Sequence, residues 1–271
     1  KTVEDVILVS AMPWKSSYLI DREGYILHEW KTNSTPGAHD RLLPNGNLLR
    51  GFTPTVDYNG NPIPSSYNVP IGGASGGVQE FDWNGNLVWQ YIGKDAKKIQ
   101  HHTFQRMANG HTLILLWEQI TQAEAIAAGR DPKFTPAVGI YPDMIEEVDA
   151  TPYPGVPKLV KKWRVWDHIV QDRIPGIWSY GNVKDAKKFD LNYATPNPFG
   201  YQDWTHANTV EHNAKTNELI INFRQWGAFF VLDWSDGPTF GQIKARFGNP
   251  CSYGAGECPS ARAERVSPGR A

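Results

Sequence analysis

A repeat with a period of 61 residues constrains the fold of this chain more than any other feature of its sequence. Residues 18–30 align without a gap with residues 79–91, and an Asp, a Gly and a closing aromatic residue recur at matching positions. Partial copies begin at Glu147 and Val231. The two best-matched copies read as a strand, a turn at Asp-x-x-Gly and a second strand. The pattern predicts an array of similar β-units.

A second hairpin follows each of the first three copies, so each unit has four strands. Four-stranded units that recur along a chain are typical of β-propeller blades. We therefore expect an all-β fold of antiparallel blades, with inner strands that start near Ala38, His102 and His206. A two-sheet sandwich is the alternative, and the long repeat period makes it less favoured. The second hairpins lie at residues 42–49, 100–117 and 206–224.

The repeats fill residues 1–250 with about three and a half blades. Propellers usually close with about four to eight blades, and an open one would expose a long sheet edge. We therefore expect an incomplete propeller that belongs to a longer parent protein. Residues 251–271 read as a cysteine loop and an irregular tail. Residues 119–129 read as a helical insertion, because helix-forming residues precede Gly129, which can end the helix.

Aromatic and turn-forming residues are abundant, which favours many short strands. The chain has 11 Trp, 11 Tyr, 11 Phe, 25 Gly and 20 Pro. Its net charge of −1 gives no global field that would attract nucleic acid or an anionic membrane. No apolar run approaches the ~18 residues needed to cross a bilayer. We expect a soluble chain with no nucleic-acid partner and no membrane span, and leave self-association into a homo-oligomer open.

Two histidines occupy matching places in their hairpins. His102 aligns with His206, and each begins the first strand of a second hairpin. Equivalent positions on successive blades converge around a propeller axis, so we expect both histidines to share one cavity. Arg224 lies as far after Lys215 as His206 lies before it, so antiparallel pairing places Arg224 opposite His206. Imidazole and guanidinium groups together suit a small tetrahedral anion.

Neighbouring residues add smaller signals. His101 either orients the site or packs, because adjacent strand residues point to opposite faces. A metal centre of these histidines and Asp203 is disfavoured, since the short ligand spacings of zinc sites are missing from the sequence. We predict no metal and no cofactor. The only two cysteines, Cys251 and Cys258, close a glycine-containing loop, which favours a disulfide and a periplasmic or secreted protein.

An ordered set of short motifs runs from about Val6 to Pro250. The motifs are Tyr18–Asp21, His28–Trp30, Leu42–Leu48, Gln79–Asn86, His101–His102, Trp163–His168, Asp203–Asn208 and Arg246–Pro250. Each Asn-Gly hairpin alone is a weak signal, but the set in this order is specific. It resembles the bacterial arylsulfotransferase family.

The resemblance implies a six-bladed, usually periplasmic propeller that transfers a sulfuryl group from an aryl sulfate to a phenol. The family needs no nucleotide donor and works by a ping-pong mechanism through a sulfohistidine. His102 and His206 resemble active-site histidines, Arg224 the sulfate-binding arginine and Asn208 a nearby polar contact. His101 and Trp204 are further candidates for substrate binding. The cysteine pair resembles a disulfide that some members carry near the site.

The chain departs from the family at the nucleophile. The histidine that carries the sulfuryl group in the family follows the cysteine loop, whereas the last histidine here is His212. We therefore expect the nucleophile outside these residues, and a 271-residue form that binds anions but transfers little. Two alternatives stay open: a propeller polysaccharide lyase with a His base and an Arg, and a propeller that only binds an anionic ligand.

Overall fold

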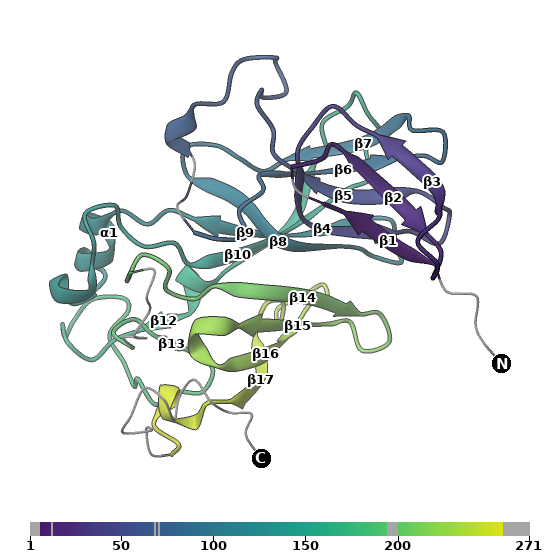
Figure 1. Cartoon of the computed structure of the whole chain (residues 1–271). Coiled ribbons are helices and arrows are strands. Elements are labelled where there is room, and N and C mark those ends of the chain that lie inside the picture. The colour runs from purple at the N-terminus through teal and green to yellow at the C-terminus, as the bar shows by residue number, and fades with distance from the viewer. Residues whose placement is uncertain (1–5, 12, 68, 70, 194–199, 257–271) are drawn as a thin grey trace. The chain divides into compact units, whose positions relative to one another are not determined.

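The chain is mainly β-structure and forms two compact units (Figure 1). A computed structural model describes residues 6–256 except 12, 68, 70 and 194–199. Unit 1 consists of residues 1–117 and 145–162, and unit 2 of residues 118–144 and 163–271.

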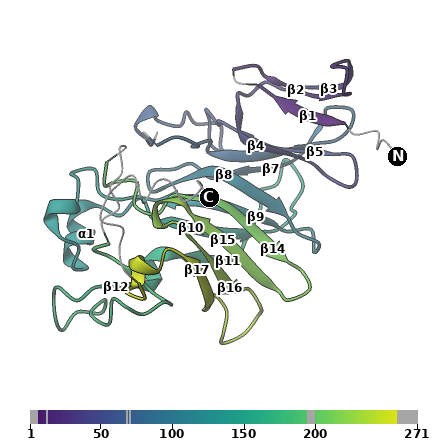
Figure 2. The same cartoon turned by 60° about the horizontal axis from the view of Figure 1, so that its bottom comes forward.

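Unit 1 begins with two antiparallel sheets that share a core. The three-stranded sheet has the order β1 (Ile7–Ser10), β2 (Ser16–Ile20) and β3 (Ile26–Lys31). The four-stranded sheet has the order β4 (Pro36–Leu42), β5 (Leu48–Phe52), β6 (Gly77–Phe81) and β7 (Leu87–Ile92). Leu19 and Trp30 of the first sheet pack against Leu48 and Phe81 of the second, and Figure 2 shows the sheets face to face. Every residue of β5 and β6, the central strands of the four-stranded sheet, is buried.

The next sheet has four strands in the spatial order β11-β10-β9-β8. Their bounds are β8 (Lys98–Arg106), β9 (Thr112–Glu118), β10 (Asp143–Val148) and β11 (Leu159–Arg164). Every residue of β9 and β10 is buried; β9 has the apolar run expected of a central strand, whereas β10 also buries Asp143, Glu146 and Glu147. Residues 118, 143–144 and 163–164, at the ends of these strands, belong to unit 2.

Unit 2 contains a further antiparallel sheet and a short parallel pair. The sheet has the order β14 (Ala207–Asn213), β15 (Glu218–Phe223), β16 (Ala228–Asp233) and β17 (Ile243–Gly248). The parallel pair is β12 (Ile169–Val170) and β13 (Phe189–Asp190). Phe189 stacks on Phe230 of β16, with ring centroids 4.8 Å apart, which joins the pair to the sheet.

The described residues also form short 3₁₀ turns. One lies in unit 1, η1 (Ser65–Tyr67), and the others lie in unit 2: η2 (Pro132–Phe134), η3 (Val165–His168), η4 (Arg224–Trp226) and η5 (Pro250–Tyr253).

The predicted helical insertion is α1, which spans Gln122–Ala127. Thr121 and Glu124 form a reciprocal capping box at its start. Gly129, with φ of 95°, follows the last turn, and the N–H groups of residues 129 and 130 donate to the carbonyls of Ile126 and Ala125. This pair of bonds is a Schellman motif, so Gly129 ends the helix as predicted.

The prediction of an all-β chain built from four-stranded antiparallel sheets is confirmed. The first strands of the three four-stranded sheets start at Pro36, Lys98 and Ala207, close to the predicted starts. The arrangement of the sheets around one axis stays a prediction. The predicted tail, residues 259–271, lies outside the described residues.

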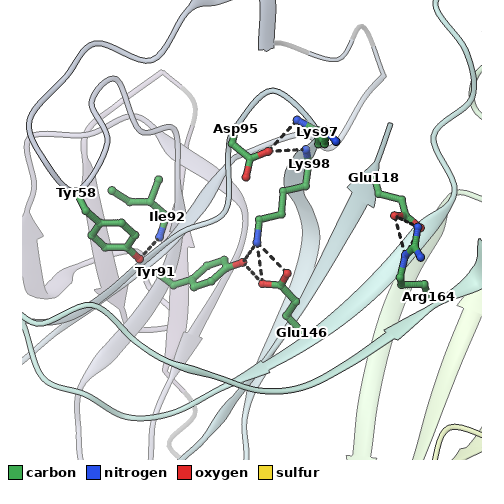
Figure 3. Close-up of polar contacts among 9 residues, drawn as sticks. All are labelled: Tyr58, Tyr91, Ile92, Asp95, Lys97, Lys98, Glu118, Glu146 and Arg164. Atoms are coloured by element: carbon green, nitrogen blue, oxygen red, sulfur yellow. Dashed lines mark hydrogen bonds and ion pairs between the residues drawn. The ribbon is translucent and has the colours of Figure 1, made fainter. Parts of the chain in front are cut away.

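Two largely buried ion pairs hold the sheet that carries His102 (Figure 3). Lys98 of β8 donates to both carboxylate oxygens of Glu146 on β10, at 2.8 and 3.0 Å, and the Tyr91 hydroxyl donates to Glu146 at 2.6 Å. Burial and then the Glu146 charge raise the pKa of Tyr91 well above its usual value. Arg164 donates its Nε and Nη2 to Glu118, which ties the end of β11 to the end of β9. Buried charges of this kind are costly unless paired, and here each is paired across the sheet, Lys98 of β8 with Glu146 of β10 and Arg164 of β11 with Glu118 of β9.

Asp190 at the end of β13 should make unit 2 less stable as pH rises. Burial is the main cause that raises its pKa to about 6, and the nearby Asp172 charge adds to the effect. Because the folded state holds this proton more tightly than the unfolded state, its contribution is complete below about pH 4 and lost by about pH 6. We expect Asp190→Asn to be more stable than wild type at pH 7 by roughly 1 to 3 kcal/mol and to match it at pH 3.5. Urea unfolding at both values tests this, and equal pH dependence in both proteins would contradict it.

Candidate active site

The two predicted catalytic histidines have the same unusual backbone conformation. Among the described residues, the non-glycine residues with positive φ are His102 at 45°, His206 at 51° and Asn217 at 53°. This left-handed region costs an L-residue on the order of 1 kcal/mol or more, and such strain gathers at functional sites. His102 lies within β8 and His206 directly precedes β14, each the first strand of its sheet. Their shared conformation supports the predicted equivalence of the two positions.

His206 and Arg224 face each other across the mouth of the β14–β15 hairpin. The Arg224 N–H donates to the His206 carbonyl at 3.0 Å. This contact depends on a bulge: Thr209 pairs with Asn222 and Ala207 with Phe223, so Asn208 has no partner in the ladder. In a regular ladder without the bulge, Asn208 would pair with Phe223 and Ala207 would lie opposite Arg224. The predicted pairing is therefore confirmed, and Asn208, half-buried, is the residue that produces it.

A carboxylate holds the ring of His206. Its Nδ1 lies 2.8 Å from both Oδ1 and Oδ2 of Asp203, and both residues are buried. Gln225 Nε2 donates to Asp203 Oδ2 at 2.8 Å. Since an ionised carboxylate only accepts hydrogen bonds, Nδ1 must carry a proton. The arrangement fixes the tautomer and makes Nε2 the nitrogen that can serve a ligand.

Asp143 of β10 holds the backbone on either side of His206, and sequence reasoning missed it. Its Oδ2 accepts the Ala207 N–H at 2.9 Å and the Thr205 hydroxyl. Its own N–H donates to Thr205 Oγ1 at 3.0 Å. These bonds fix both neighbours of the strained residue, which is how a left-handed conformation is maintained. The sequence carries no local signal for this role, because the burial of Asp143 and its bonds to Thr205 and Ala207 are seen only in the structure.

His102 is held from two sides within unit 1. Its N–H donates to the carbonyl of Gly73 at 2.9 Å, and its Nδ1 lies 2.9 Å from Nδ1 of His101. The His102 ring lies so close to Gly73 that a Cβ built there would be 2.1 Å from Cε1 of the ring. Gly73 also has φ of 97°, a conformation that favours glycine. Gly73 therefore packs directly against the imidazole of His102, and a larger residue would not fit there.

Gly73→Ala should displace the His102 ring and destabilise unit 1 by about 1 to 3 kcal/mol, from overpacking and from the positive φ. Gly72→Ala is the matched control, since a Cβ at Gly72 meets nothing within 4 Å. The measurements are the melting temperature and the NMR shift of the His102 Hε1 proton. An unchanged shift in Gly73→Ala, or an equal shift in both variants, would contradict the close contact.

The other predicted site residues have different environments. Arg224 is exposed at the start of η4. His101 is fully buried in β8. Trp204 is 1% exposed and packs against the Trp226 ring and the Arg130 guanidinium, so any part it has in substrate binding requires a rearrangement.

The structure brings His206, Asn208 and Arg224 together within unit 2, and His101 and His102 within unit 1. The convergence of His102 with His206 on one cavity stays a prediction, because the two residues belong to different units. Cys251 lies in η5, whereas Cys258 lies outside the described residues, so the disulfide also stays a prediction.

Within the described part of the chain, no cluster of His, Cys, Asp and Glu side chains has the make-up of a metal site. No helix in that part is long and apolar enough for a membrane span.

Comparison with known proteins gave one family and several distant structures. No curated protein matched the chain. A protein of unknown function from Bacteroides caccae is 11% identical with a TM-score of 0.37, over 91% of this chain and 73% of that one. Dihydro-heme d1 dehydrogenase NirN is 10% identical with a TM-score of 0.37, over 92% of this chain and 38% of that one. At these scores neither structure informs the fold or the function.

The family comparison agrees with the site. The family described as Arylsulfotransferase (ASST) matches residues 1–244, which include both strained histidines, Asp203 and Arg224. The match covers most of the chain and confirms the resemblance seen in its motifs. The chain belongs to the arylsulfotransferase family.

Proposed function

We propose that this chain contributes the sulfate-binding part of an enzyme that transfers a sulfuryl group from an aryl sulfate to a phenol. The observation that carries the proposal is the pair of left-handed histidines, each with Nδ1 held by a buried partner. Fixing Nδ1 in this way assigns Nε2 of each ring to the ligand. In the family's six-bladed propeller, His102 and His206 would then face one sulfuryl group from successive blades.

The two histidines and Arg224 supply hydrogen-bond donors for the negative charge that develops on the phenolic and sulfuryl oxygens during transfer. As the S–O bond to the aryl group breaks, negative charge grows on the phenolic oxygen, and an Nε2–H can donate to that oxygen or transfer a proton to it. Arg224 adds a planar fork of donors for the sulfuryl oxygens, which is geometry that lysine lacks. Its backbone N–H bond to the His206 carbonyl keeps the main chain of Arg224 next to that of His206. Preorganised donors of this kind account for much of an enzyme's rate enhancement.

The proposed reaction has two displacements at sulfur. In the first, a histidine nitrogen attacks opposite the departing phenolate, so an S–N bond forms as the S–O bond breaks and the phenolate takes up a proton. In the second, a phenol oxygen attacks the sulfohistidine, loses its proton and regenerates the free imidazole. The attacking imidazole must approach from the side of sulfur opposite the leaving oxygen. His102, His206 and Arg224 serve better as donors than as that nucleophile.

The test is release of 4-nitrophenol from 4-nitrophenyl sulfate by the native-length protein, with and without a phenol acceptor. The proposal predicts little release alone, rapid release with phenol, and phenyl sulfate as the second product. Cleavage of a uronate polymer with a rise in ultraviolet absorbance would instead indicate a lyase. Failure to turn over any aryl sulfate, despite binding sulfate, would leave a binding protein and overturn the proposal.

A further inference from the structure

His101 and His102 touch each other although they are neighbours on one strand. Successive side chains on a regular strand point to opposite faces. The left-handed φ of 45° at His102 breaks that alternation, and the two Nδ1 atoms come within 2.9 Å. The ring planes are nearly perpendicular, at 87°. The left-handed backbone at His102 therefore allows a direct hydrogen bond between the imidazole rings of His101 and His102.

His101 is the fixed member of this pair. It is fully buried, and its ring stacks on Trp117 of β9 with centroids 3.8 Å apart and planes 6° apart. Its carbonyl accepts the side-chain amide of Gln100 at 2.9 Å. His102 is only half-buried. The His101 ring is therefore fixed in position and cannot move to contact a ligand, but it can hold the His102 ring in one orientation.

The Nδ1–Nδ1 contact has room for one proton only. If His101 donates, neutral His102 carries its proton on Nε2 and offers a donor to a ligand. If His102 donates, its Nε2 is a bare acceptor when the ring is neutral and a donor when the ring is an imidazolium. The hydrogen bond with His101 therefore determines which form of His102 faces the ligand.

We propose that His101 is a positioning residue that sets the ring orientation and the protonation form of His102, an inference that rests on the proposed function for its catalytic meaning. His101 then does not bind substrate, the role that the sequence suggested for it. When His102 is an imidazolium, its Nδ1–H donates to His101 and its Nε2 proton goes to the departing phenolate oxygen. The S–O bond breaks, the phenol forms and His102 becomes neutral, with no change at His101.

This pair differs chemically from the equivalent pair in unit 2. His206 has the same backbone conformation, but its Nδ1 partner is the carboxylate of Asp203. A carboxylate only accepts, so it holds the Nδ1 proton on His206 in every state. An imidazole both donates and accepts, so the proton between His101 and His102 can lie on either ring. The structure thus gives His102 two accessible neutral forms, and gives His206 one.

Two substitutions separate a hydrogen-bonding role from packing. His101→Phe keeps a flat ring on Trp117 and removes the bond to His102. His101→Asn places an amide near the position of Nδ1 and restores a partner. Long-range ¹H–¹⁵N spectra of the histidine rings, recorded on the 271-residue chain, report the protonation of each His102 nitrogen. Tryptophan fluorescence and the melting temperature verify that each variant is folded.

We expect a slowly exchanging Nδ1 proton between the two rings in wild type. In His101→Phe this proton should disappear and the His102 nitrogen shifts should average, whereas His101→Asn should retain a protected proton. In the native-length enzyme, kcat should fall on the order of 10²-fold in His101→Phe and less in His101→Asn, with a smaller change in KM, because a misplaced catalytic group costs rate more than binding. His102 spectra that are identical in wild type and His101→Phe would overturn the proposal. Absence of turnover in wild type would refute the proposed function, while the spectra would still decide the role of His101.

Discussion

Replacing Asp203 with Asn should lower kcat/KM of the native-length enzyme for 4-nitrophenyl sulfate by about 10²- to 10⁴-fold, by analogy with loss of the carboxylate that orients a catalytic histidine. Gln225 Nε2 donates to the Oδ2 position of Asp203, so an amide there must present its oxygen to Gln225. Its NH2 group then faces Nδ1 of His206, which has to become an acceptor. The neutral ring then carries its proton on Nε2, and it loses the anionic partner that stabilises the imidazolium, so His206 becomes a weaker proton donor to the departing phenolate.

The matched control is Asp172→Asn, an exposed position in the same unit. It removes one carboxylate charge without touching His206 and should leave the rate within about twofold, as surface substitutions usually do. Ring ¹⁵N shifts of His206 should report the change of tautomer in Asp203→Asn alone. A rate for Asp203→Asn equal to that of the control would show that the carboxylate only packs.

Arg224→Ala should cost about 2 to 4 kcal/mol of transition-state stabilisation, or roughly 30- to 10³-fold in kcat/KM, the scale set by removing one oxyanion donor. The side chain is exposed, and its backbone N–H, which alanine retains, makes the bond to His206. The fold should therefore survive the substitution. The readouts are the rate with 4-nitrophenyl sulfate and the affinity for inorganic sulfate by calorimetry.

Arg224→Lys tests the planar fork, and Arg173→Ala tests the loss of a positive charge elsewhere. Arg173 is exposed in unit 2, so its loss changes the net charge equally. We expect Arg173→Ala to match wild type and Arg224→Lys to recover only part of the lost rate, since lysine cannot make two parallel hydrogen bonds. Equal sulfate affinities for wild type and Arg224→Ala would remove Arg224 from the site.

Local signals made the hairpins and the helix predictable. The Asn-Gly turns need a glycine with positive φ, and Gly46, Gly85 and Gly110 have φ of 85°, 85° and 87°. The Thr121–Glu124 capping box and Gly129 bound α1 by the same kind of short-range chemistry. Signals that act within a few residues can be read from one sequence.

The details of the site depend on contacts between distant segments, so the sequence could not reveal them. Symmetry about Lys215 predicted that Arg224 faces His206, but most of the hairpin pairs in a different register. The bulge at Asn208 corrects the offset at the open end. Asp143, 62 and 64 residues from Thr205 and Ala207, supports the strained segment from another strand. A histidine tolerates the left-handed conformation without requiring it, so the positive φ of His102 and His206 could not be predicted from the residues around them.

The left-handed backbone at His102 and His206 limits how these positions can change during evolution. The left-handed conformation raises the conformational free energy of most L-residues. It has no such cost for Gly, and its cost for Asn and Asp is smaller than for the average residue. A relative that has lost the chemistry should therefore carry Gly, Asn or Asp at these positions more often than Gln, Tyr or Lys, although the latter resemble histidine in size or polarity. Retained histidines in a relative would then indicate selection for the imidazole itself, because residues that suit the backbone better are available. The chemistry of a new family member could thus be judged from two positions before any assay.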